Sequence, residues 1–280
     1  MTTITPEAHG GHALHVAFCG PVSLRLLKDR LDPGTELPDG YECPLTSYLI
    51  LALLDAGVQV TVITSCCDIV RPLGWRGRNL RVVATPRRNH YLYCLDAYRQ
   101  ELRRMCEAIT EARPDIVHAN WAYEFADAAL RSKLPCLVTS HDSPWSVAKA
   151  SHHWYRLYRA IYATLCVVPR IQNVSFVSPY LEHEFARFHR VTARRWIVPN
   201  GLASYLVSPT PSRGVKVEGC PAFIAISGWG SLKNPQTLIK AFAYVKNKIP
   251  GATLSLFGSG FQADGPAQKW AEKAGVSQGI

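Results

Sequence analysis

The eight residues Arg194-Arg195-Trp196-Ile197-Val198-Pro199-Asn200-Gly201 divide the chain into two parts. A short apolar run ends there in Pro-Asn-Gly, a combination that terminates a strand and turns the backbone. A polar connector with two prolines follows at residues 208–214, and a new strand–turn–helix pattern begins after it. The sequence therefore predicts two α/β domains, residues 1–200 and residues 201–280, with a binding site expected in the cleft between them.

Before this stretch, short apolar runs alternate with helical patterns. Residues 45–54 are almost wholly apolar and predict a buried helix, and apolar residues at three- and four-residue steps from Leu95 to Ile109 predict a second, amphipathic one. Strands are expected at residues 14–19, 58–64, 80–84, 115–119, 136–140, 173–178 and 196–198. Such alternation is typical of a Rossmann-like, doubly wound parallel sheet, so the fold class is α/β.

The second part begins the same pattern again. Strands are expected at residues 222–227 and 252–257, each followed by a glycine-rich turn, and a helix at residues 235–248. Only these two strands precede Ile280. Because a sheet of this kind normally has five or six strands, the sequence predicts a partial second domain.

Composition limits the class of protein and its location. The chain has 280 residues and a formal net charge of +10, which favours an acidic partner such as a phosphorylated small molecule, an anionic membrane or nucleic acid. Nine cysteines, two of them adjacent at Cys66 and Cys67, argue against a disulfide framework and for a reducing compartment. The N-terminus lacks a secretory signal pattern, and no apolar run reaches the ~18 residues of a transmembrane helix. We therefore expect a cytoplasmic protein.

Five motifs follow one another along the chain. They are Pro114-Asp115-Ile116-Val117-His118, Val138-Thr139-Ser140-His141-Asp142, Val177-Ser178-Pro179-Tyr180, Val198-Pro199-Asn200-Gly201 and Gly228-Trp229-Gly230-Ser231-Leu232-Lys233-Asn234. Together they resemble the motifs of the retaining glycosyltransferases of the group-1 (family 4) type. That family has the GT-B fold, two facing Rossmann-like domains. The resemblance implies transfer of a sugar, with retention of configuration, from a nucleotide-diphosphate donor to a hydroxyl of a lipid, polysaccharide or small-molecule acceptor. It implies no cofactor and no metal ion, because Lys, Arg and helix termini stabilise the leaving diphosphate.

The first domain carries the candidate catalytic residue. His141 and His118 each end a predicted strand, at the edge where open α/β sheets bind ligands. In the family, the histidine of the Thr-x-His-Asp motif faces the transferred sugar, and His141 holds that place. His118, Asp142, Asn200 and Gly40 are the candidate substrate-binding residues. Alternatively, the histidines only pack at strand ends and Asp142 caps a turn; Glu124, inside a helical stretch, is expected to be solvated.

The second domain carries the candidate diphosphate site. A strand followed by Gly-x-Gly exposes backbone amides near a helix N-terminus, where an anion is favoured. The family places a lysine there on the donor diphosphate, which indicates Lys233 with Gly228, Gly230 and Gly258. Trp229 departs from the family, which usually has arginine at that position, and the family's paired-glutamate motif has no counterpart in the 280 residues.

Residues 143–181 contain no Asp or Glu, and their cations alternate with aromatic residues. This composition suits peripheral contact with an anionic membrane, and it equally suits an ordinary helix packed on the sheet.

Two other classes of function stay open. A non-catalytic module that binds a nucleotide sugar or glycan would explain the missing glutamates. Nucleic-acid binding rests on charge alone, and no specific nucleic-acid partner is expected. A dinucleotide dehydrogenase is disfavoured, because no Gly-x-Gly-x-x-Gly follows the first strand.

Overall fold

The computed structural model describes residues 13–89, 91–202 and 219–276. The chain divides into two compact units, residues 1–207 (unit 1) and residues 208–280 (unit 2). The predicted connector at residues 208–214 lies outside the described residues.

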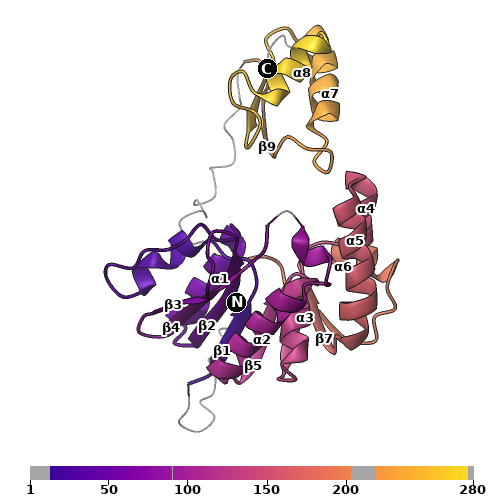
Figure 1. The fold of residues 1–280 in the computed structure, drawn as a ribbon. Coiled ribbons are helices and arrows are strands. Elements are labelled where there is room, and N and C mark those ends of the chain that lie inside the picture. The colour runs from indigo at the N-terminus through magenta and orange to yellow at the C-terminus, as the bar shows by residue number, and fades with distance from the viewer. Residues whose placement is uncertain (1–12, 90, 203–218, 277–280) are drawn as a thin grey trace, which may run out of the picture. The chain divides into compact units, whose positions relative to one another are not determined.

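Unit 1 is built on an eight-stranded sheet in the order β3-β4-β2-β1-β5-β6-β7-β8 (Figure 1). All neighbours are parallel except β3 and β4, which are antiparallel. The strands are β1 His15–Cys19, β2 Gln59–Cys66, β3 Leu73–Arg76, β4 Leu80–Pro86, β5 Ile116–Asn120, β6 Cys136–Ser140, β7 Asn173–Phe176 and β8 Arg194–Ile197. The seven predicted strands are confirmed.

The prediction of seven strands missed one, β3. Its sequence, Leu-Gly-Trp-Arg, has no continuous apolar run, and its side chains alternate between half-buried and exposed. An edge strand is covered on one side only, so it lacks the apolar signal of a buried parallel strand.

The helices of unit 1 follow the parallel strands. They are α1 Pro44–Asp55, α2 Arg99–Ala112, α3 Glu124–Arg131, α4 Pro144–Ser151, α5 Trp154–Tyr162 and α6 Pro179–Ala186. Shorter turns are η1 Leu24–Arg30, η2 Leu92–Cys94, η3 Ala163–Val167, which is a π-helical continuation of α5, and η4 Val168–Arg170. One hydrophobic cluster joins residues of α2, α3 and α6 to one face of the sheet, and another joins α1 and η1 to the other face.

Two of the helix predictions need correction. The helix predicted at residues 45–54 is not wholly buried, because Leu45 and Leu49 are each 38% exposed. The amphipathic helix begins at Arg99. Leu95 is 85% exposed and precedes it, and Tyr98 adopts a left-handed conformation (φ 62°) at the helix start.

Unit 2 contains two parallel strands, β9 Ala222–Ile226 and β10 Thr253–Phe257, and two helices, α7 Pro235–Lys248 and α8 Pro266–Lys273. Its core is small and centres on Ile239, Phe242 and Leu254. Leu238 in α7 is 39% exposed. On β9 the side chains of Ile224 and Ile226 are 70% and 84% exposed. Most of the apolar surface of this strand is therefore uncovered in the described residues.

All nine cysteines are free thiols. Cys67 in unit 1 and Cys220 in unit 2 are exposed, whereas Cys19, Cys66 and Cys136 are buried. Burial raises the pKa of the Cys66 and Cys136 thiols to about 12, so both stay protonated at neutral pH. No helix in the described part of the chain has both the length and the apolar character needed to cross a bilayer.

Candidate functional site

The order of the strands defines a switch point between β1 and β5. From β1 the chain builds outward through β2 and β4, and it then returns to β5 on the other side of β1 and builds toward β8. At such a point the loops after the two central strands part, and ligands of open α/β sheets bind in the crevice between them. Gly20 after β1 and Asn120 at the end of β5 meet here. A Cβ atom at Gly20 would lie 2.8 Å from the Cβ of Asn120, so this approach requires glycine.

Next to this contact, His141 is bonded to Asn120. The Nε2 atom of His141 lies 2.8 Å from the Asn120 Oδ1 atom, and Asn120 is buried. With Nε2 donating, the ring nitrogen Nδ1 is an acceptor. The buried Nδ2 group of Asn120 has no hydrogen-bond partner among the described residues. An unpaired buried donor of this kind costs about 1–3 kcal/mol.

A second polar row crosses β5, β6 and β7. The Nε2 atom of His118 lies 2.7 Å from the Thr139 hydroxyl, which lies 2.6 Å from the Ser175 hydroxyl. Burial lowers the pKa of both His118 and His141 to about 4, and each ring is therefore neutral at pH 7. Neutral imidazoles, hydroxyls and an amide bind sugar hydroxyls without needing a counter-charge.

Both rows line one cavity of about 570 Å³ in unit 1. Leu45 and Leu49 of α1 form part of its wall, and Asn200 lies in the segment after β8 that also lines it. The structure thus brings together three of the residues predicted from the sequence, His118, His141 and Asn200. The wall of the cavity is mostly apolar, and a small number of hydrogen-bonding groups converge in it, as in most sites for small ligands.

Two other predicted residues do not line this cavity. The carboxylate of Asp142 accepts a hydrogen bond of 2.8 Å from the Tyr123 hydroxyl, and burial raises the pKa of Asp142. Gly40 lies against η1, where a Cβ would be 3.2 Å from the Leu24 side chain. Gly40 therefore has a packing reason for being glycine.

Glu124 contradicts the expectation that it is solvated. It begins α3, is 4% exposed, and lies between two arginines. Its oxygens are 3.4 Å from Arg159 and 3.6 Å from Arg87. Burial opposes the charge of each arginine, but Glu124 and the surrounding tyrosines raise the pKa of both overall. Sequence analysis missed Arg87, although its position directly after β4 placed it at the carboxyl edge of the sheet.

Trp121, also missed, follows Asn120 with φ 70°, a left-handed conformation that is unusual for a bulky residue. Its ring contacts Tyr41 edge to face at 5.2 Å. The guanidinium of Arg159 lies 3.6 Å from the centre of the Tyr123 ring. Strained backbone of this kind clusters at functional sites, and here it adjoins the cavity residue Asn120.

The predicted donor residues of unit 2 lie in the turns after β9 and β10. Nothing lies within 4 Å of a Cβ built at Gly228 or Gly230, so their backbone is open to a ligand. Lys233 is exposed just before α7. Gly258 has φ +135°, and a Cβ there would lie 1.8 Å from the Ser227 carbonyl oxygen. Glycine at position 258 is therefore required by the fold of the turn.

Trp229, which replaces the family's arginine, packs within unit 2. Its ring centre is 6.2 Å from Phe261 and 5.8 Å from Trp270. This aromatic cluster holds the turn after β9 against α8. Trp229, where the family usually has arginine, therefore has a packing role in unit 2.

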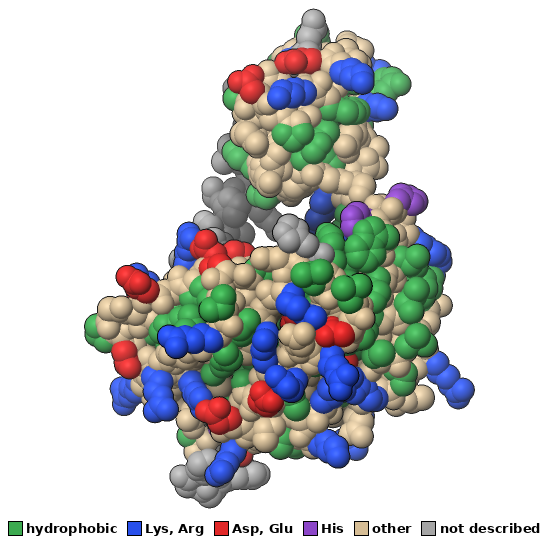
Figure 2. Space-filling view, in the orientation of Figure 1, with side chains coloured by type: hydrophobic (Ala, Val, Ile, Leu, Met, Phe, Trp, Pro, Cys, Tyr) green, Lys and Arg blue, Asp and Glu red, His purple; other side chains and the backbone are tan. Residues whose placement is uncertain are grey.

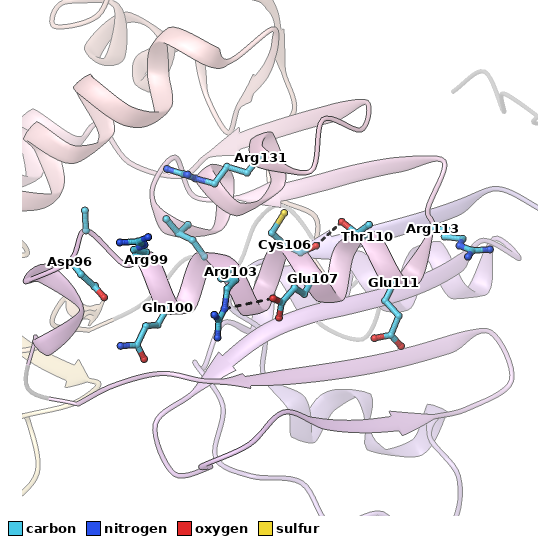
Figure 3. Close-up of a pocket in the computed structure, with 12 residues that line it drawn as sticks. Asp96, Arg99, Gln100, Arg103, Cys106, Glu107, Thr110, Glu111, Arg113 and Arg131 are labelled. Atoms are coloured by element: carbon cyan, nitrogen blue, oxygen red, sulfur yellow. Dashed lines mark hydrogen bonds and ion pairs between the residues drawn. The ribbon is translucent and has the colours of Figure 1, made fainter.

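A larger hollow of unit 1, about 1420 Å³, lies elsewhere, along α2 (Figure 3). Its charged side chains spread along the helix instead of converging on one point. Some are paired at the surface, as Arg103 is with Glu107 at 3.6 Å. The smaller cavity at the switch point is the better candidate, since its polar groups converge and are buried.

Residues 45–203 match the family model of Glycosyltransferase Family 4, and the chain belongs to that family. No curated protein sequence matches the chain significantly. Several solved structures have a similar fold at low identity. One described as "Trehalose-6-phosphate from E. coli bound with UDP-2-fluoro glucose" is 10% identical, with a TM-score of 0.57, covering 93% of this chain and 68% of that one.

Two further structures extend the comparison. An α,α-trehalose 6-phosphate synthase from Burkholderia multivorans is 13% identical (TM-score 0.53; 95% of this chain, 65% of that one). A putative UDP-N-acetylglucosamine 2-epimerase from Listeria monocytogenes is 10% identical (TM-score 0.52; 95% and 67%). At these identities the likeness defines the fold, which is α/β and GT-B-like, with Rossmann-like units.

Proposed function

We propose that this protein transfers a sugar from a nucleotide-diphosphate sugar to a hydroxyl of an acceptor, with retention of configuration. The observation that carries the proposal is the cavity at the switch point, in which His118, His141 and Asn120 present neutral hydrogen-bonding groups within the segment matched by the family model. Unit 1 would bind the acceptor and present His141 to the transferred sugar. The acceptor is a lipid, a polysaccharide or a small molecule.

In the transfer, the acceptor oxygen bonds to the anomeric carbon of the sugar. The bond from that carbon to the diphosphate breaks, its electron pair leaves with the diphosphate, and the acceptor proton passes to the diphosphate or to solvent. We assign the stabilisation of this leaving group to Lys233 and to the open backbone at Gly228 and Gly230. No metal ion or cofactor enters the proposal.

The first donor to test is UDP-glucose, because a structure with this fold is described with a fluoro analogue of it. Binding of UDP is measured by calorimetry, and transfer by release of UDP together with mass spectrometry of the glycoside. Lys233→Ala should weaken UDP binding by about 1.5–3 kcal/mol, the scale of a lost charge-assisted hydrogen bond. The matched control is Lys269→Ala, at an exposed lysine of α8.

His141→Ala should abolish transfer while leaving UDP binding unchanged, and its thermal transition should stay cooperative. The control His183→Ala, at an exposed histidine of α6, should keep activity. Binding of nucleotide sugars without turnover, across a panel of donors and acceptors, would indicate a binding module instead. Epimerisation of the sugar without transfer would place the chemistry with the epimerase that shares the fold.

A further inference from the structure

Asn120 and His141 are brought together by the pairing of two neighbouring strands. Asn120 is the last residue of β5 and pairs with Thr139 of β6, and His141 directly follows the end of β6. The backbone N–H of Trp121 continues this pairing, because it donates to the Thr139 carbonyl oxygen at 2.9 Å. The two side chains therefore lie at adjacent strand ends, with the Nε2 atom of His141 2.8 Å from the Asn120 Oδ1 atom.

The Asn120 side chain has little freedom to move. Asn120 is 1% exposed. A Cβ atom at Gly20 would lie 2.8 Å from the Asn120 Cβ, so the chain after β1 closes the space on that side. Trp121 has φ 70°, and a bulky residue keeps such a conformation only where the surrounding structure fixes it. The carbonyl oxygen of Asn120 is therefore held in one place beside the His141 ring.

This contact decides which ring nitrogen of His141 carries the proton. Lys and Arg side chains, with acidic ones among them, are spread over the surface of unit 1 (Figure 2), but the partner of His141 is a neutral amide. Burial lowers the pKa of His141 to about 4, so the ring is neutral at pH 7 and has a single N–H. Because a carbonyl oxygen can only accept a hydrogen bond, that N–H is at Nε2.

The other ring nitrogen, Nδ1, then has a free lone pair. It has no hydrogen-bond partner among the described residues, yet it is not one of their buried unpaired atoms, so solvent can reach it. His141 lines the cavity at the switch point. A ligand in this cavity can therefore meet a nitrogen that accepts a hydrogen bond and cannot donate one.

We propose that Asn120 is a positioning residue that holds His141 in the tautomer with the proton on Nε2, so that Nδ1 accepts a hydrogen bond from a hydroxyl of the sugar. The choice of a sugar hydroxyl rests on the proposed function, whereas the tautomer does not. In this role His141 selects a ligand group that donates a hydrogen bond and disfavours one that only accepts, such as a fluorine or a carboxylate at the same place.

The tautomer is observable without turnover. Long-range 1H–15N correlation spectra of the whole chain distinguish a protonated from an unprotonated ring nitrogen, and the signals of His141 are those that His141→Ala lacks. At about pH 8, where the ring is neutral, we expect Nε2 protonated and Nδ1 unprotonated. The opposite tautomer in the parent protein would overturn the proposal, because the Asn120 amide would then donate to Nε2.

Three variants separate positioning from packing. Asn120→Ala removes the acceptor, and Nδ1 should then be partly protonated. Asn120→Asp keeps an acceptor oxygen and should keep the tautomer at about pH 8, while the pKa of His141 rises because a carboxylate favours the imidazolium. The matched control is Asn173→Ala, at the opposite end of the sheet, where the Asn173 amide donates to the Cys136 carbonyl oxygen at 3.2 Å. This control should leave the signals of His141 unchanged.

Transfer from UDP-glucose supplies a second measurement. Asn120→Ala should lower kcat roughly two- to twelvefold, the range expected for one hydrogen bond, with Asn120→Asp less affected and UDP binding unchanged. An unaltered His141 tautomer in Asn120→Ala would overturn the proposal even if turnover fell, since the loss would then come from packing. An unaltered pKa of His141 in Asn120→Asp would also overturn it. Absence of transfer by the parent would count against the proposed function alone, and the tautomer would still be decided by the spectra.

Discussion

Replacing Gly20 by alanine tests the geometry of the switch point directly. The added Cβ would stand 2.8 Å from the Cβ of Asn120, which is 0.6 Å short of the 3.4 Å at which ordinary contact begins. Asn120 cannot simply rotate away, because its Cα and backbone nitrogen both lie 3.5 Å from the added atom and belong to β5, which pairs with β1. The two strands must therefore separate.

Overpacking of this kind costs about 1–3 kcal/mol, and the loss of glycine flexibility in the unfolded chain offsets about 0.4–1 kcal/mol of it. The net expectation is a destabilisation of up to about 2.6 kcal/mol, measured as a lower urea midpoint at unchanged slope. The hydrogen bond between His141 and Asn120 should also weaken, which a shift of the His141 imidazole resonances would report.

Gly74→Ala is the matched control. Gly74 lies in β3 with an ordinary φ, and the only atom near its added Cβ is the Val82 carbonyl oxygen at 3.8 Å. This variant should be neutral or stabilised by a few tenths of a kcal/mol. Equal urea midpoints for Gly20→Ala and Gly74→Ala would show that residue 20 and Asn120 do not approach as closely as described.

Three further predictions concern charge and local stability. The pKa of His118 and of His141 is lowered to about 4 in the folded state, so the unfolded chain binds protons at a higher pH than the folded chain does. The free energy of unfolding should therefore fall as the pH drops from about 6.5 to about 4, by up to about 1.4 kcal/mol per pH unit for each histidine. Urea titrations that show no such loss would contradict the burial of both rings. Glu124→Gln leaves Arg87 and Arg159 buried without their carboxylate and should lower the free energy of unfolding by about 3–5 kcal/mol. The control Glu111→Gln breaks an exposed pair with Arg81 and should lower it by at most about 1 kcal/mol. Comparable urea midpoints for the two variants would refute the buried triad. Amide hydrogens in the strands of unit 2 should exchange much faster than those in the central strands of unit 1, because β9 is largely uncovered. Exchange is measured by mass spectrometry. Uniformly slow exchange would show that unit 2 is as stable as unit 1.

Strands whose side chains are buried on both faces have the clearest signal in the sequence. Strand β6 was predicted with its observed limits, Cys136–Ser140, because its apolar start, Cys-Leu-Val, is typical of a buried parallel strand. The edge strand β3 gave no such signal. Part of the cavity was predicted from the sequence. His118 and His141 each end a strand, and because the carboxyl ends of parallel strands lie at one edge of the sheet, the two residues were expected to lie close together.

What sequence analysis missed depends on pairing across the fold. Glu124 looks like an ordinary solvated residue of a helix until Arg87 and Arg159 are brought to it, and both are tens of residues away in the sequence. The same limit applied to residues 143–181. Their composition could not separate Tyr155, which is buried, from Trp154, which is exposed, because the two are adjacent and only the packing of α5 assigns their sides.

The distribution of thiols supplies built-in probes. Cys67 is exposed in unit 1 and Cys220 is exposed in unit 2, whereas three other thiols are buried. Reactivity of cysteine requires access and thiolate character, so a maleimide reagent should modify these two positions first. Once the four partly exposed thiols, Cys43, Cys94, Cys106 and Cys166, are replaced by serine, a donor and an acceptor dye at Cys67 and Cys220 would report the distance between the units by fluorescence transfer, with and without nucleotide sugar.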